Sequence, residues 1–188
     1  MLDPHVETTQ SHRTLWLKLA IVVAILGIAV ATYSTNHQIQ FNKLGKTDSV
    51  CNIKESLNCD TIAADSFAMI LDVPLATWGL GYFLANLTLL FLALSHRAKF
   101  VEYIQTYSLM VLIGVLTSVF FFYRAEFTIG VLCPSCMASY GVNILQGLLL
   151  IIFRKQIPRN FTLTSLVYGG LVATLVVFCV AISYLLMF

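Results

Sequence analysis

The chain has 188 residues, of which 59% are hydrophobic and only 11% are charged, and its formal net charge is +2. A water-soluble domain carries roughly 25% charged residues, because its surface faces water. This shortfall of charge excludes an ordinary soluble protein, and the small net charge gives no indication of a nucleic-acid partner. The length allows one compact domain, and we expect it to be an all-α, polytopic membrane protein.

Five apolar runs are long enough to cross a bilayer, which takes roughly 20 helical residues. They are residues 15–33, 74–94, 103–123, 129–153 and 161–188. Because hydrocarbon offers no hydrogen-bond partner to the backbone, each run is predicted to be a transmembrane helix. Residues 1–14 are then a cytoplasmic tail, and residues 34–73 form the one long loop. We see no strand alternation and no internal repeat.

The first run has a second interpretation as a signal peptide. Ala29-Val30-Ala31 is typical of a cleavage site. The 14 residues before the run contain Asp3 and Glu7, which makes the segment long and acidic for a leader. We therefore favour an uncleaved helix.

Lysine and arginine are biased to one side of this topology. Seven lie in the amino-terminal segment and in the links after the second and fourth helices: Arg13, Lys18, Arg97, Lys99, Arg154, Lys155 and Arg159. Four lie on the other side: Lys43, Lys46, Lys54 and Arg124. Basic residues favour the cytoplasmic side, so the amino terminus is predicted inside, and the long loop and the carboxyl terminus outside.

The second half of the long loop is predicted to form a helix on the membrane surface. Asn58 or Asp60 suits the helix cap, apolar residues then recur near one face, and Pro74 disfavours helix in the residue before it.

Four of the five cysteines fall on the outer side of this topology. Cys51 and Cys59 lie in the long loop, and Cys133 and Cys136 form a C-x-x-C motif at the outer end of the fourth helix. Side chains at i and i+3 share a helix face, and Pro134 suits the first helical turn. Free N–H groups and the helix dipole lower the pKa of a thiol there. In an oxidising compartment such cysteines are disulfides or are cycled, so the two pairs predict a thiol relay.

Electrons that enter such a relay need an acceptor. The sequence contains no glycine-rich dinucleotide loop and no haem-attachment motif. Because the C-x-x-C motif lies at the depth of the lipid, we expect the acceptor to be a lipid-dissolved quinone.

Three other interpretations of the cysteines stay open. The four could form two structural disulfides, or a four-thiolate metal site, although the gap between Cys51 and Cys59 exceeds the usual ligand spacing. Cys133 and Cys136 could also be small packing residues. Cys179 is expected to be an apolar core residue of the fifth helix. The histidines are expected to be solvated: His5, His12, His37 and His96.

Three segments make the sequence resemble the vitamin K epoxide reductase family in its bacterial form, over about residues 15–155. The first is Cys51-x7-Cys59 followed by Asp60, and the second is Val73-Pro74-Leu75-Ala76-Thr77-Trp78-Gly79. The third is Cys133-Pro134-Ser135-Cys136, with Tyr140 one turn later. The order of the two pairs differs from DsbB-type proteins, in which the C-x-x-C pair comes first.

The resemblance implies a four-helix bundle around a quinone (ubiquinone or menaquinone), with a fifth helix alongside, in a bacterial cytoplasmic membrane with the cysteines on the periplasmic side. It implies oxidation of a thioredoxin-like (DsbA-like) partner coupled to quinone reduction. Cys51 would exchange with the partner, and Cys59 would shuttle to Cys133. Cys136 would face the quinone and form the adduct or charge-transfer contact with it. Tyr140 would donate a hydrogen bond to a quinone carbonyl, or else act as an interfacial anchor.

The sequence departs from the family pattern at two positions. Many relatives carry Ser or Thr six residues after the second loop cysteine, where this chain has Asp65, followed by Ser66. An asparagine that binds quinone in some relatives falls near Leu75. The chain also lacks a fused thioredoxin-like domain, so we expect the partner to be a separate protein.

Overall fold

The computed structural model describes residues 4–45, 47, 49–153 and 163–187. Five helices within these residues are long and apolar enough to cross a membrane. They lie in α1 (Pro4–Leu44), α3 (Leu75–Ser95), α4 (Phe100–Arg124), α5 (Pro134–Ile152) and α6 (Leu163–Met187). The predicted all-α, polytopic membrane fold is confirmed.

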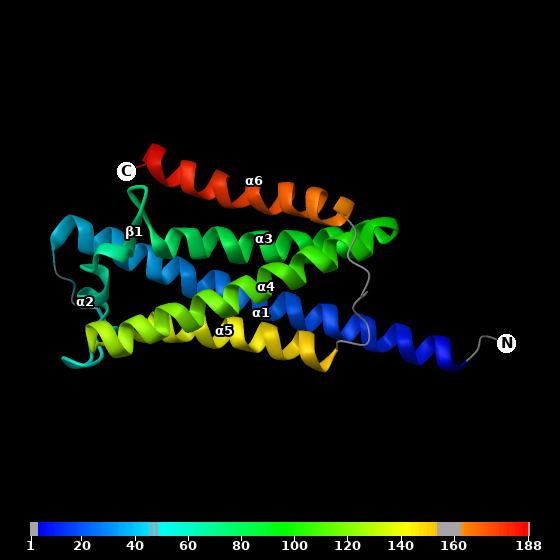
Figure 1. Cartoon of the computed structure of the whole chain (residues 1–188), viewed down its shortest axis with the longest axis horizontal. Coiled ribbons are helices and arrows are strands. Elements are labelled where there is room, and N and C mark those ends of the chain that lie inside the picture. Colours follow the sequence, from blue (N-terminus) through cyan, green and yellow to red (C-terminus); the bar gives the residue numbers. More distant parts are fainter. Residues whose placement is uncertain (1–3, 46, 48, 154–162, 188) are drawn as a thin grey trace.

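The long helices pack as a four-helix bundle with a fifth helix on its side (Figure 1). Helix α1 packs against α3 and α5, and α4 also packs against α3 and α5, which closes the ring. Helix α6 packs against α3 and α4 from outside. The bundle therefore has its own interior, which α6 flanks.

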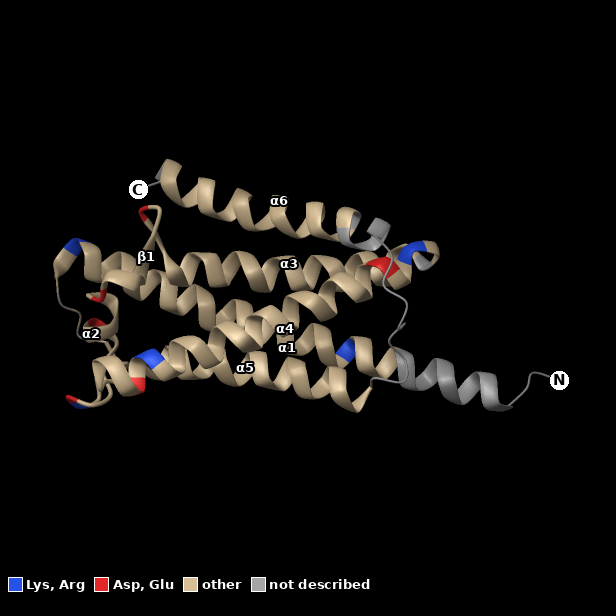
Figure 2. Cartoon of the chain, in the orientation of Figure 1, with Lys and Arg blue, Asp and Glu red and all other residues tan. Residues whose placement is uncertain are grey.

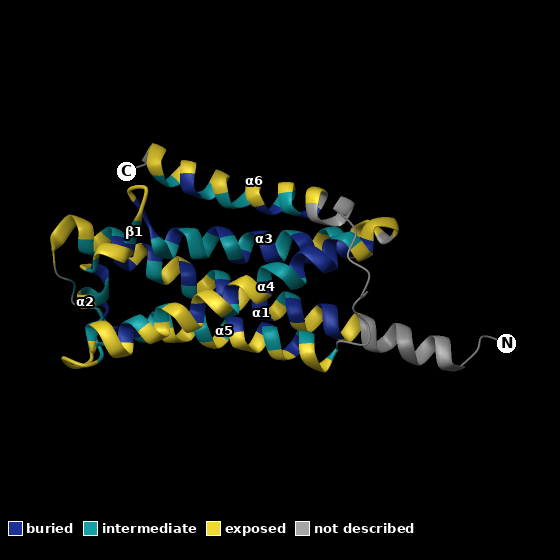
Figure 3. Cartoon of the chain, viewed as in Figure 1, coloured by how far each residue is buried: buried dark blue, intermediate teal, exposed yellow. Residues whose placement is uncertain are grey.

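The interior of the bundle contains one large cluster of buried apolar residues. Trp16, Leu89, Ile104 and Tyr107 are fully buried within one cluster. Figure 3 shows buried residues facing the bundle interior and exposed residues on its outside, and many of the exposed residues are large and apolar. In a membrane protein this outer apolar surface faces lipid.

Helix α1 extends past its predicted end at Tyr33 to Leu44. The added segment is polar, which is why the sequence indicated a loop. Thr35, His37 and Gln38 are nevertheless buried, because the folded loop packs against this part of the helix. The predicted start of the long loop at residue 34 is therefore wrong.

Helix α5 begins at Pro134 rather than at residue 129. Residues Ala125–Ile129 instead continue α4 as a π-helical turn, η3. Gly130 then adopts a left-handed backbone conformation, with φ of 72°, and ends that turn. The apolar run was continuous in sequence, but the glycine divides it between two helices.

The long loop folds into short elements instead of one surface helix. They are α2 (Cys59–Ala63), η1 (Ser66–Ala68) and a hairpin of β1 (Met69–Ile70) and β2 (Val73–Pro74). Asn58 caps α2, and Asp65 accepts the backbone N–H of Phe67. Because Asp65 is extended, it interrupts the expected helix. The expectations of a single helix and of no strands are both wrong here.

The folded loop lies at the end of the bundle opposite the amino terminus (Figure 1). Most described carboxylates gather at this same end (Figure 2). Lys46, Arg154, Lys155 and Arg159 lie outside the described residues. Because these basic residues contribute to the charge bias from which the orientation was predicted, the membrane face that this end occupies stays a prediction.

Candidate active site

The loop cysteines form a disulfide that lies against the C-x-x-C motif. Cys51 is bonded to Cys59, and the Sγ atom of Cys59 lies 3.0 Å from the Sγ atom of Cys133. Backbone hydrogen bonds hold the two segments together, from Asn58 N–H to Leu132 O (2.9 Å) and from Leu132 N–H to Ser56 O (3.0 Å). Residues 74 apart in sequence are thereby held at the distance that thiol–disulfide exchange requires.

Cys133 and Cys136 are free thiols at the start of α5. Cys133 is the residue that caps the helix, and its Sγ atom accepts the backbone N–H of Cys136 at 3.3 Å. The Ser135 hydroxyl lies 3.2 Å from the same sulfur. Hydrogen bonding by the Cys136 side chain, helped by Ser135 and the backbone and opposed by burial, lowers the pKa of Cys133 from 9.0 to about 7. Cys133 is therefore the sulfur best suited to act as a thiolate at neutral pH.

Three of these four cysteines are shielded from solvent. The exposed fractions are 3% for Cys51, 3% for Cys59 and 5% for Cys133. By contrast, Val50, which precedes Cys51 in the sequence, is 85% exposed. A protein that exchanges with Cys51 therefore needs the loop to move.

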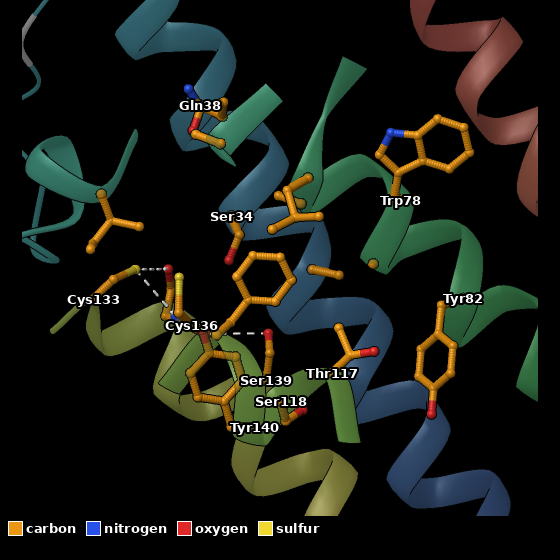
Figure 4. A pocket seen from close by; sticks show the side chains of 18 of the residues that line it. Ser34, Gln38, Trp78, Tyr82, Thr117, Ser118, Cys133, Cys136, Ser139 and Tyr140 are labelled. Atoms are coloured by element: carbon orange, nitrogen blue, oxygen red, sulfur yellow. Dashed lines mark hydrogen bonds between the residues drawn. The ribbon is translucent and has the colours of Figure 1, made fainter. Parts of the chain in front are cut away.

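A cavity of about 320 Å³ opens beside Cys133 and Cys136. Figure 4 shows Cys136 and Tyr140 of α5 on one wall and Trp78 and Tyr82 of α3 on the opposite wall. Its lining is mainly apolar and also includes Cys59, Cys133, Leu75 and Ile113. This size and lining are typical of a pocket for one small organic molecule.

Asn143 supplies a buried polar group to the cavity. Its Nδ2 donates to Ser118 Oγ at 2.8 Å, and Ser118 Oγ donates to Gly114 O at 2.8 Å. The Oδ1 atom of Asn143 has no hydrogen-bond partner within the described residues. Since a buried amide oxygen without a partner is costly, this atom is suited to a ligand that carries a hydroxyl. The mainly apolar cavity, the thiols beside it and this acceptor fit a quinone and its quinol.

Two α1 residues hold the two ends of α2, and the sequence did not reveal either. His37 Nε2 lies 3.1 Å from Asp60 Oδ1, near the first turn of α2. Gln38 Nε2 donates to Ala63 O at 3.1 Å, at its last turn. His37 was expected to be solvated, which is wrong, because its exposed fraction is 8%. His96 is exposed as expected, and the side chains of His5 and His12 lie outside the described residues.

Asp65 serves the scaffold rather than the cavity. Both of its carboxylate oxygens accept from Arg124 at 3.1 Å, and the Arg124 guanidinium stacks over Phe67 at 3.9 Å. Asp65 and Ser66 are not among the residues that line the cavity, whereas Leu75 is. In this structure Asp65 therefore ties the loop to α4.

Cys179 lies on α6, apart from the other four cysteines. It is a free cysteine and is exposed on the bundle surface, so the expectation of a core position is wrong. The sulfurs of Cys51, Cys59 and Cys133 lie within 4.8 Å of one another. Two of the three are joined as a disulfide, and a disulfide is not the thiolate that a metal requires.

Comparison with known families gives one match that covers most of the chain. The sequence model of the vitamin K epoxide reductase family matches residues 18–151. No curated protein matches the chain.

Proposed function

The chain belongs to the vitamin K epoxide reductase family and is thus a multi-pass membrane oxidoreductase. From this premise we propose that it oxidises the dithiol of a separate thioredoxin-like protein and passes the electrons to a lipid-dissolved quinone. The relay is assigned to the periplasmic face of a bacterial cytoplasmic membrane. The observation that carries the proposal is the 3.0 Å separation of Cys59 and Cys133 Sγ atoms, with a disulfide on one side and a free dithiol on the other.

The outer half of the reaction uses Cys51 and Cys59. A thiolate of the partner attacks Cys51, and Cys59 leaves as a thiolate. The second thiol of the partner then displaces Cys51, which leaves the partner with a disulfide and the loop with two thiols. Two electrons and two protons have moved from the partner to the chain.

The inner half uses the C-x-x-C pair in its disulfide form. Cys59 attacks Cys133, and Cys136 leaves. Cys51 then attacks Cys59, which reforms the loop disulfide and frees Cys133. The resulting state, with Cys51 bonded to Cys59 and with Cys133 and Cys136 as thiols, is the state that the structure has.

The cavity beside Cys136 is the proposed quinone site. When bound there, a quinone accepts two electrons and two protons, and Cys133 and Cys136 return to a disulfide. Tyr140 would donate a hydrogen bond to an oxygen of the ring, and Asn143 Oδ1 would accept one from a hydroxyl of the quinol. The apolar lining keeps water away from the reacting sulfur.

The test follows quinone absorbance in the purified protein, with reduced thioredoxin as the electron donor. Replacing any one of the four relay cysteines with alanine should abolish quinone reduction. The matched control is Cys179→Ala, which removes a cysteine away from the relay. Full activity in any of the relay variants would refute the proposal, and bound metal at one ion per chain would favour the metal-site alternative.

A further inference from the structure

The loop that carries Cys51 and Cys59 is tied to α1 by a polar cluster centred on Asp60. Asp60 accepts from Thr47, through the backbone N–H at 2.9 Å and the hydroxyl at 2.7 Å. His37 Nε2 lies 2.9 Å from the same hydroxyl and 3.1 Å from Asp60 Oδ1. Burial alone would raise the pKa of Asp60, but the hydrogen bonds from Thr47 and its neighbours lower it overall. Asp60 is therefore a carboxylate at neutral pH.

The arrangement of protons in this cluster follows from its chemistry. The single hydroxyl hydrogen of Thr47 points to Asp60, and a carboxylate only accepts. Toward His37 Nε2, the Thr47 hydroxyl oxygen and Asp60 Oδ1 can therefore only accept a hydrogen bond, so Nε2 must carry the hydrogen. His37 is thus a donor from α1 to the first turn of α2, as Gln38 is to its last turn.

The same cluster reaches the cysteines through Asn52. Its Nδ2 donates to Thr47 O at 2.8 Å, and its Oδ1 accepts the backbone N–H of Cys59 at 3.0 Å. A continuous set of hydrogen bonds thus runs from His37 to the backbone of the shuttling cysteine. In this arrangement Cys59 lies beside Cys133, and Cys51 is buried.

We propose that His37 is a positioning residue of the relay, whose hydrogen bond to Asp60 and Thr47 holds the loop in the position that delivers Cys59 to Cys133 and hides Cys51. This inference rests on the proposed function, in which Cys51 must also be reached by a partner protein. The loop therefore alternates between this closed position and an open one. Loss of the His37 donor shifts the balance to the open position, so it favours exchange at Cys51 and slows transfer to Cys133.

The first experiment measures how often Cys51 opens, without quinone or partner. In a Cys59→Ala, Cys179→Ala background, Cys51 is the free thiol once Cys133 and Cys136 are oxidised to a disulfide. Its rate of alkylation by a membrane-impermeant maleimide should rise about tenfold or more in His37→Leu, the factor expected for one hydrogen bond to a charged group. His37→Gln keeps an N–H donor and should stay within about threefold of the parent.

Two further variants serve as controls for this measurement, one for a failure of His37→Leu to fold and one for the effect of any His→Leu change. Thr47→Val removes the central hydroxyl at nearly constant shape and should accelerate alkylation in the same direction, even where His37→Leu fails to fold. His96→Leu makes the same change in an exposed histidine at the other end of the bundle and should leave the rate unchanged. An unchanged rate in Thr47→Val and His37→Leu, or equal rates in His37→Gln and His37→Leu, would overturn the proposal.

The second experiment measures the opposite effect on transfer. In a Cys136→Ala background, a Cys59–Cys133 bridge should form about tenfold more slowly with His37→Leu than with His37. His37→Gln, which keeps an N–H donor, should form the bridge within about threefold of the parent, whereas a general folding defect at this position would slow the bridge in both variants. Absence of the bridge even with His37 intact would refute the proposed relay, whereas the alkylation result tests the positioning role separately.

Discussion

Replacing Cys136 with serine or with alanine separates its two contributions to the relay. Both variants lack the thiol with which Cys133 could otherwise pair, so a Cys59–Cys133 bridge can be resolved only by Cys51, and both variants should show that bridge in exchange with the loop disulfide. The sulfur atoms are already 3.0 Å apart, against about 2.05 Å in a disulfide, so little backbone movement is needed. The variants differ because serine keeps a side-chain donor for Cys133 and alanine does not.

The size of the difference follows from the pKa of Cys133. With a pKa of about 7, half of the thiol is ionised at pH 7, whereas with the ordinary 9.0 about 1% is ionised. The second value is the limit in which the Cys136 side chain accounts for the whole net shift; Ser135 and the backbone also lower the pKa, and burial raises it. Serine therefore gives up to about 50-fold more thiolate. The lower basicity makes each thiolate about eightfold less nucleophilic, for a Brønsted slope of about 0.45. At pH 7 the serine variant should form the bridge up to about sixfold faster.

The pH profile provides a sharper test than one rate. Above pH 10 both thiols are ionised, and the alanine variant, with the more basic thiolate, should be faster. The two profiles should therefore cross, with a plateau above about pH 8 for serine and a continued rise for alanine. The assay uses Cys179→Ala protein with the loop disulfide formed, a pH jump, an acid quench and mass spectrometry of the bridge. Identical profiles would refute the role of the Cys136 side chain in activating Cys133.

Three shorter predictions test other parts of the site. Tyr140→Phe should raise KM for the quinone about 3- to 10-fold in the absorbance assay, the effect of one neutral hydrogen bond; an unchanged KM would leave Tyr140 as an interfacial anchor only. Cys179→Ala should keep quinone reduction within about twofold of the parent, and loss of most activity in folded protein would require a fifth cysteine in the relay. Val50 and Ala98 are exposed and lie at opposite ends of the bundle. With either residue replaced by cysteine in otherwise cysteine-free protein, an impermeant thiol reagent added to intact cells should label Val50→Cys and not Ala98→Cys. The reverse pattern would invert the predicted orientation.

The number of membrane helices and the redox motif were determined by the sequence itself. A bilayer imposes a local requirement, since each crossing segment must be apolar and must satisfy its own backbone. Five apolar runs therefore sufficed to predict five helices. The helix-start signal at Cys133 and Pro134 is likewise local, because a side chain that caps a helix and a proline in the first turn act within four residues, although the apolar run alone placed the predicted start at residue 129. The same local information could not divide the continuous apolar run at Gly130.

Only the tertiary structure decided which polar residues belong to the site. His37 and Gln38 lie in a polar stretch that by itself indicates a solvated loop, and they become buried only because α2 folds back onto α1. Asn143 gave no signal among apolar neighbours, since its place beside the cavity depends on Ser118 of another helix. The burial of two cysteines was also not predictable from their neighbours in the sequence. Cys51 lies in a loop and is buried, whereas Cys179 lies in an apolar helix and is exposed. Hydrophobicity and capping act within a few residues, whereas burial and hydrogen-bond partners arise from segments that meet only when the whole bundle has formed.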